Sequence, residues 1–159
     1  MPQRATDSRR LDIRVECFML CDHVRVENGK LYILGGGWTR LTPPYLPLPY
    51  SFHIALKLAV PAELAGAPLP LQLEVRDAEG RDIATSALDI QTEPADVPDQ
   101  GAAPTIPLNV PLGVDLTFVS PGVFTLALAA AGERIAETAL LVAAPAPPRA
   151  NEEGATSDA

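Results

Sequence analysis

Apolar residues at every second position are the feature that most constrains how this chain folds. The pattern is clearest between residues 51 and 60, where the alternating apolar side chains are Phe52, Ile54, Leu56 and Leu58. Side chains of a strand point alternately to its two faces, whereas an amphipathic helix needs apolar residues three and four positions apart. The alternation therefore predicts a strand with one buried face.

The same pattern recurs along the chain between breaks rich in proline and glycine. We predict strands at about residues 13–26, 30–34, 51–60, 70–76, 81–92, 106–118, 123–130 and 134–143. Pro107 and Pro111 confine the first half of their strand to an edge or an extended connection, because proline cannot donate a hydrogen bond to a sheet. The alanines of the last two segments would also suit a helix, but Gly132 would cost that helix about 1 kcal/mol. Many short strands are typical of an all-β, single-domain antiparallel sandwich, either immunoglobulin-like or a related Greek key.

The two ends of the chain differ in composition from its middle. With 159 residues the chain is long enough for one domain with a sizeable core, and we expect the sandwich at residues 11–144. Residues 1–10 are polar, and residues 145–159 lack large apolar side chains. We predict that both are disordered tails. The acidic segment 93–104 is predicted to be an exposed loop.

Charge and cysteine usage limit the classes of partner and the compartment. The formal net charge is −8 with no basic stripe, which argues against binding to nucleic acid or to a membrane surface. No apolar run approaches the roughly 18 residues of a membrane span, and the first residues do not resemble an export signal. Cys17 and Cys21 would lie about 13 Å apart on one strand, beyond the reach of a disulfide. Free thiols suit a reducing compartment, so we expect the chain to be cytoplasmic.

A tight hairpin is predicted where Asn28 and Gly29 follow the first strand. Both residues tolerate the positive φ that a type I′ turn requires. The two-residue turn places Val26 opposite Leu31, and two residues further back it places Val24 opposite Ile33. The hairpin is therefore the most strongly specified element of the sequence.

Three glycines follow the hairpin and precede the only tryptophan of the chain, Trp38. A phosphate-binding loop would need a following Lys and Ser or Thr and a helix, and neither is predicted here. Gly35, Gly36 and Gly37 therefore indicate a bulge or bend in the strand. The hairpin register puts Asp22 opposite Gly35 on the core-facing side, and we predict that its carboxylate caps the N–H groups of the bend.

The sequence predicts no catalytic, metal or cofactor site. Cys17, Cys21, His23 and His53 contain the ligand types of a zinc site, but strand spacing keeps the two thiols too far apart to share one ion. A hydrolase that uses Asp22 with His23 or His53 is a third reading, without a motif to support it. We therefore expect the chain not to be an enzyme.

Aromatic residues gather in and beside the proline-rich connection that follows the glycines. Trp38, Arg40, Tyr45 and Tyr50 are residue types that often anchor protein interfaces, and they are our candidate contact surface. The alternative is that these rings cover one end of the sandwich.

The runs ENGKLYILGGGW, YSFHIALKLAVP, LQLEVRDAEG and PGVFTLALAAAGERIAE together resemble a bacterial family of uncharacterised small domains. The resemblance extends over about residues 15–142 and is carried mainly by the pattern ENGK-x4-GGGW. It implies no activity, ligand or site residues.

Two functions remain open on these grounds. The first is a protein-interaction or assembly module that contacts an unknown protein partner, or itself, through an edge strand or through the connection between Trp38 and Tyr50. The second is a sandwich that binds a small ligand in a pocket bounded by the bend at Gly35–Gly37 and the loop at 93–104.

Overall fold

Each stretch with period-two alternation forms a β-strand. The computed structural model describes residues 12–92 and 104–147, and within these ranges the strands are β1 (Arg14–Glu27), β2 (Lys30–Gly36), β3 (Arg40–Leu41), β4 (Leu48–Pro61), β5 (Pro68–Arg76), β6 (Asp82–Gln91), β7 (Thr105–Phe118), β8 (Gly122–Ala130) and β9 (Glu133–Val142). One turn of 3-10 helix, η1 (Ala62–Leu64), follows β4. The alanine-rich segments are the strands β8 and β9, as the sequence predicts. The sequence pattern missed β3, because two residues are too few to show a period.

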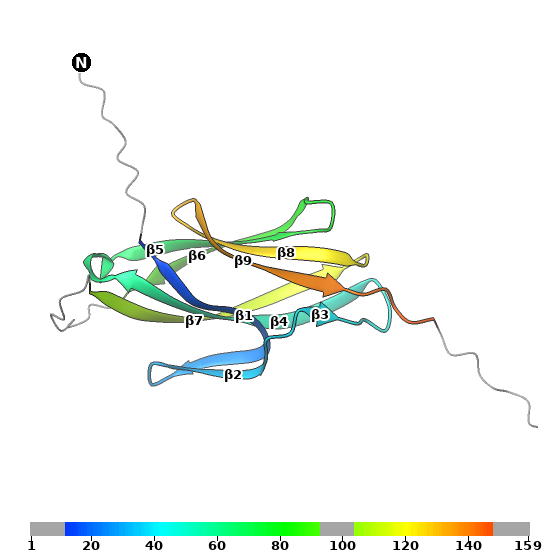
Figure 1. Cartoon of the computed structure of the whole chain (residues 1–159), viewed down its shortest axis with the longest axis horizontal. Helices are drawn as coiled ribbons and strands as arrows, with labels where there is room; N and C mark the ends of the chain where they lie inside the picture. The colour runs from blue at the N-terminus through cyan, green and yellow to red at the C-terminus, as the bar shows by residue number, and fades with distance from the viewer. Residues whose placement is uncertain (1–11, 93–103, 148–159) are drawn as a thin grey trace, which may run out of the picture.

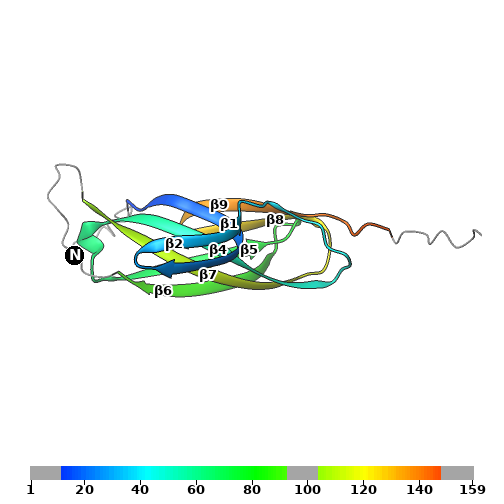
Figure 2. The ribbon, with the colours of Figure 1, turned by 90° about the horizontal axis from the view of Figure 1, so that it is seen from below.

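The strands form two facing sheets, and the predicted all-β sandwich is confirmed (Figures 1 and 2). One sheet has the order β2-β1-β4-β7 and the other has the order β3-β9-β8-β5-β6. Pairing is antiparallel throughout the described strands, except that β3 runs parallel to β9. The first tail and the acidic loop, apart from Pro104, lie outside the described residues, as does the second tail from residue 148 onward.

The core lies between the sheets and uses the face of each strand that the alternation predicts. In β4 the alternating apolar residues Phe52, Ile54, Leu56 and Leu58 are each exposed by 1% or less. Phe118 at the end of β7 and Phe124 in β8 meet edge to face across the core, with ring centroids 5.0 Å apart. The burial of apolar side chains between the two sheets is the dominant favourable contribution to folding.

The β1–β2 hairpin does not continue the flat sheet but doubles back over its outer face (Figures 1 and 2). The first half of β1 pairs with β4, and from Cys21 onward β1 pairs with β2 instead. Val24 and Leu31 of the hairpin pack against Cys17 and Ala55, which belong to the sheet underneath. Ala55 is fully buried for this reason, although it points away from the main core. The hairpin therefore adds a partial third layer to the sandwich.

The glycines make this reversal possible. Gly35 and Gly37 have φ values of 59° and 87°, in the left-handed region that residues with a Cβ rarely adopt. A Cβ at Gly36 would lie 2.9 Å from Met19 Sδ, so the backbone also comes too close to its neighbours for a side chain. The N–H of Gly37 donates to the carbonyl oxygen of Leu20 at 2.9 Å and fixes the chain after the bend.

The prediction that Asp22 faces the core and caps the glycine bend is wrong. Its side chain is exposed, and the carboxylate lies over Gly35, where an added Cβ would overlap Asp22 Oδ2. No hydrogen bond found among the described residues joins this carboxylate to the N–H groups of Gly35–Gly37. The physical reason is that β1 turns between its two pairing partners, so the rule that every second residue shares a face does not hold across the bend.

We predict that Gly35→Ala lowers the free energy of unfolding by about 1–2 kcal/mol, because alanine at this positive φ is strained and its methyl group would displace Asp22. Urea denaturation followed by circular dichroism measures the change. Gly113→Ala in β7 is the matched control. A Cβ at Gly113 would have no atom within 4 Å, and the backbone of Gly113 is not in the left-handed region. Equal effects of the two substitutions would contradict the role of the bend.

Candidate functional site

Two of the four predicted contact residues belong to the end of the core. Trp38 packs edge to face against Tyr50 and Phe52, at centroid distances of 6.2 Å and 5.6 Å. Trp38 and Tyr50 are half-buried, and the indole Nε1 of Trp38 is enclosed without a hydrogen-bond partner. Their large apolar area is therefore used within the sandwich, as the alternative reading of these rings describes.

The other two predicted contact residues are exposed. Arg40 lies on β3 beside Leu141 of β9, and Tyr45 in the following loop is 59% exposed. The four residues are therefore not brought together as one exposed surface.

The structure brings Asp22, His23, His53 and Cys21 close together, and the side chains of His53 and Cys21 form hydrogen bonds to the backbone. His53 Nδ1 donates to the backbone oxygen of Asp22 at 3.1 Å, and its ring meets that of His23 edge to face at 4.8 Å. Cys21 is fully buried and its Sγ donates to the backbone oxygen of His53 at 3.6 Å. Burial raises the pKa of the Cys21 thiol, which keeps it protonated and weakly nucleophilic at neutral pH.

The second cysteine, Cys17, is also held as a protonated thiol, and the described residues contain no group suited to bind a metal. Cys17 donates to the backbone oxygen of Ala55 at 3.5 Å, and burial raises its pKa as well. Within residues 12–92 and 104–147, no group of three or more His, Cys, Asp or Glu side chains is placed to hold a metal ion. The thiols therefore serve as small packing groups under the hairpin.

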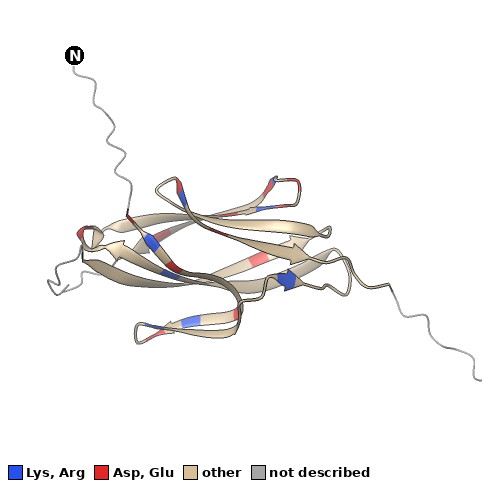
Figure 3. Cartoon of the chain, viewed as in Figure 1, with Lys and Arg blue, Asp and Glu red and all other residues tan. Residues whose placement is uncertain are grey.

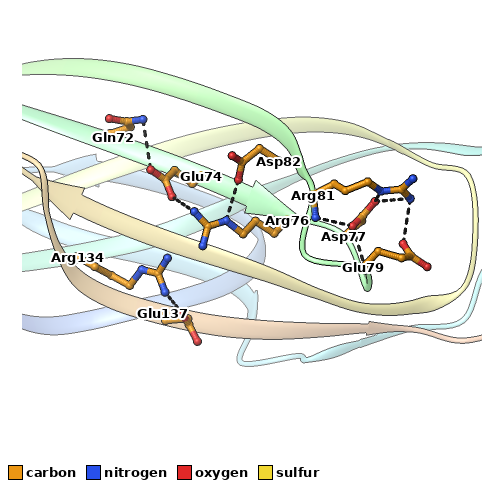
Figure 4. Close-up of polar contacts among 9 residues, drawn as sticks. All are labelled: Gln72, Glu74, Arg76, Asp77, Glu79, Arg81, Asp82, Arg134 and Glu137. Carbon is orange, nitrogen blue, oxygen red and sulfur yellow. Dashed lines mark hydrogen bonds and ion pairs between the residues drawn. The ribbon is translucent and has the colours of Figure 1, made fainter.

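Charged side chains are spread over the described surface and paired locally, without a basic patch (Figure 3). Arg76 of β5 contacts Asp82 at 2.7 Å and Glu74 at 3.0 Å (Figure 4). At the adjacent turn, Asp77 Oδ1 accepts from the backbone N–H groups of Glu79 and Arg81, while its Oδ2 accepts from the Arg81 guanidinium at 2.7 Å. These contacts stabilise the β5–β6 turn and leave no unpaired charge cluster there.

Strand β2 carries three consecutive large apolar residues that are all exposed. Tyr32, Ile33 and Leu34 are 45%, 39% and 68% exposed. The Arg25 guanidinium lies 5.2 Å from the centroid of the Tyr32 ring, which holds the ring in place. Together with His23 these residues line a shallow hollow, and we call this set the hairpin surface. Sequence reasoning missed it, although three large apolar residues in a row on a half-buried strand are a signal that one of them must be exposed.

The four edge strands differ in how well they resist pairing with another chain. Natural edges are blunted by proline, by charge or by shortness. Edge strand β7 contains Pro107 and Pro111, β3 has two residues, and β6 carries exposed Asp82 and Asp89. Edge strand β2 has no proline and no acidic residue, and its one charged residue, Lys30, lies at its end beside the turn. It is therefore the least protected of these four edge strands.

The turn geometry shows which backbone groups this edge offers. Asn28 and Gly29 have φ values of 50° and 70°, as in a type I′ turn. Glu27 and Lys30 are then the pair that exchanges both hydrogen bonds, and pairs alternate from there. The N–H and C=O groups of Leu31 and Ile33 consequently point away from β1, toward the open side.

A groove of about 660 Å³ lies on another side of the molecule, between the end of β6, the first half of β7 and the hairpin tip. It is lined by Val26 and Gly29 of the hairpin, and not by the glycines of the bend. Its lining residues include Gln91 and Thr92, the last described residues before the predicted loop at 93–104.

Comparison with protein families gives one match, to a "Family of unknown function (DUF6941)", over residues 16–143. The chain belongs to this family. No curated protein matches the sequence significantly. The family assignment agrees with the resemblance seen in the sequence and brings no activity with it.

Two solved structures are similar in fold at low identity. An immunoglobulin-like protein from Pseudomonas aeruginosa is 16% identical, with a TM-score of 0.45 over 85% of this chain and 99% of that one. An alkylpurine DNA glycosylase from Pseudomonas fluorescens is 10% identical, with a TM-score of 0.44 over 85% of this chain. The chain spans 31% of the glycosylase. Neither likeness bears on function.

None of the described helical residues forms a span long and apolar enough to cross a membrane.

We predict that Trp38→Ala lowers the free energy of unfolding by about 2–3 kcal/mol, because it removes the ring that covers Phe52. Tyr45→Ala should change it by less than about 0.5 kcal/mol, because that ring is mostly in solvent. Urea denaturation of the two variants measures both values. If Trp38→Ala is as stable as the Tyr45 variant, Trp38 is not part of the core.

A pH dependence is predicted for the β5–β6 turn. Burial alone would raise the pKa of Asp77, but the Arg81 guanidinium and the backbone N–H groups of Arg81 and Glu79 outweigh it and hold the pKa below its ordinary value. A lowered pKa in the folded state adds stability above the unfolded-state pKa, and that stability is lost as pH falls through the folded-state pKa. Asp77→Asn should therefore be less stable than the wild type at pH 7 and lose less stability between pH 5 and about 2. Thermal midpoints across this range test it, and parallel curves would contradict it.

Proposed function

We propose that this chain is a non-catalytic protein-interaction module that binds an extended segment of a partner protein along the open edge of β2. The observation that carries the proposal is that β2 is an unblunted edge that also bears the exposed apolar row of the hairpin surface. Edges of this kind are avoided in free proteins because they pair with other chains. A strand that is left open in this way is suited to accept one.

The backbone of β2 supplies the first half of the interaction. Leu31 and Ile33 present N–H and C=O groups on the open side, so an added strand could form a regular ladder with them. The usable edge is short, because the turn ends at Gly29 and the backbone of Gly35 is left-handed. Hydrogen bonds alone would then give a weak complex, and side chains must supply the rest.

The side chains of the hairpin surface supply the second half. Tyr32 is a residue type that often contributes strongly to interfaces, and Arg25 already restricts its ring. Leu34 is the most exposed residue of the row. Lys30 at the end of β2 forms no ion pair among the described residues, which favours a partner segment that is apolar and carries an acidic residue at one end.

A second copy of this chain suits the edge less well. Antiparallel pairing of two β2 edges places the two hairpins in one sheet with the same faces aligned, so both sandwiches would lie on the same side of it. Each copy also has a net charge of −8, which opposes close approach. We also propose that the module acts in the reducing cytoplasm, a proposal supported by the free thiols of Cys17 and Cys21.

The test is capture of partners from a lysate of the organism that encodes the chain, with tagged wild type, Ile33→Pro and Ile33→Ala. Proline removes the open-side N–H of residue 33 without removing a β1–β2 hydrogen bond, while alanine shortens the same side chain and keeps the N–H. We expect a protein whose recovery falls at least tenfold with Ile33→Pro and less than threefold with Ile33→Ala.

Both variants must first be shown to be folded from their ¹H–¹⁵N spectra. Recovery of every partner at wild-type levels by folded Ile33→Pro would exclude the β2 edge as the binding site. Recovery of untagged copies of the chain as the variant-sensitive partner would instead identify self-association.

A further inference from the structure

We propose that the groove between β6, β7 and the hairpin tip is a binding site for an uncharged, largely apolar small molecule that carries one hydrogen-bond donor. This site is separate from the β2 edge and does not depend on it. It also differs from a pocket at the glycine bend, because the residues of the bend do not line it.

The walls of the groove come from segments that only the tertiary structure brings together. Ile90 at the end of β6 belongs to one sheet, and Ile106, Leu108 and Val110 of β7 belong to the other. The groove therefore opens along the side of the sandwich where the two sheets end. Val26 closes it from the hairpin, which reaches this position because β1 doubles back (Figure 1).

Size and charge define the class of ligand. A volume of about 660 Å³ lies within the range of small-molecule sites, and well above that of a single water. Charged residues make up 20% of the chain, yet none of the described residues that line the groove is charged. An ionised ligand would lose its hydration there without gaining a counter-charge, so a neutral ligand is favoured.

The wall contains three polar side chains, and one of them, Asn109, gives the site direction; the others are Gln91 and Thr92. Asn109 of β7 donates from Nδ2 to the backbone oxygen of Gly29 at 2.8 Å, which fixes the amide and ties the hairpin tip to the sheet. Its Oδ1 is enclosed and accepts no hydrogen bond. Enclosed acceptors without a donor are rare in proteins because they are costly. A hydroxyl or N–H group on the ligand would satisfy this oxygen after a small movement of the side chain.

Three naphthalene probes of similar size test this class directly. 2-Naphthol is neutral and has a donor, 2-methoxynaphthalene is neutral without a donor, and 2-naphthoate is charged. We expect 2-naphthol to bind most tightly, at least fivefold more tightly than 2-methoxynaphthalene and at least tenfold more tightly than 2-naphthoate. Titrations followed in ¹H–¹⁵N spectra of the full chain give the affinities, and the shifted amides should be those of Gly29, Leu108 and Val110, which border the groove.

A variant that fills the groove completes the test. Val26→Trp places an indole in the groove from a position that is already 38% exposed, and should weaken 2-naphthol binding at least tenfold. Val123→Trp adds the same ring at an exposed position of β8 that does not line the groove, and should leave binding unchanged. Asn109→Leu should abolish the preference for 2-naphthol over 2-methoxynaphthalene.

Several results would overturn the proposal. These are no saturable binding of 2-naphthol up to its solubility, equal or tighter binding of 2-naphthoate, unchanged affinity in folded Val26→Trp, or shifts confined to Tyr32–Leu34. The last result would assign the probe to the hairpin surface, and it would leave the protein-interaction proposal standing.

Discussion

The β1–β2 hairpin lies folded back over the outer face of its own sheet. This arrangement depends on the left-handed backbone at Gly35 and Gly37, where the chain leaves β2. The reversal buries Ala55 and the thiol of Cys21 under Val24 and Leu31, so a second small core forms outside the sandwich. It also carries Gly29 across the sheet to Asn109 of β7. Both surfaces to which we assign binding depend on this geometry, because the fold-back turns β2 outward and supplies one wall of the groove.

Several polar side chains contribute to the structure of the bend and the turns. His53 donates to the backbone oxygen of Asp22 at the bend, and Cys21 donates to the backbone oxygen of His53. Carboxylates such as Asp77 organise turns. The apolar side chains of the hairpin surface, by contrast, are 39–68% exposed. Contiguous exposed apolar area of this kind is typical of a contact surface.

Sequence reasoning succeeded where the physical cause is local. The turn at Asn28 and Gly29 fixes the pairing of Val26 with Leu31, and this register is found in the structure. It failed for Asp22, because extending the face rule past Cys21 assumes a straight strand. It gave only as an alternative that the rings of Trp38 and Tyr50 cover one end of the sandwich, since their contact with Phe52 joins the two ends of a long connection and depends on how that end closes.

The sequence by itself determined the class of fold, the strand positions and the existence of a bend, because period-two burial, turn residues and glycine all act through neighbours in the chain. Only the tertiary structure decided which way the bend carries the hairpin, which edge stays open and which residues border the groove. Those outcomes depend on contacts between segments far apart in sequence, such as Gly29 with Asn109 and Val24 with Ala55. The energies of these contacts come from side-chain packing and strand pairing between distant segments, and a local pattern of residues does not specify them.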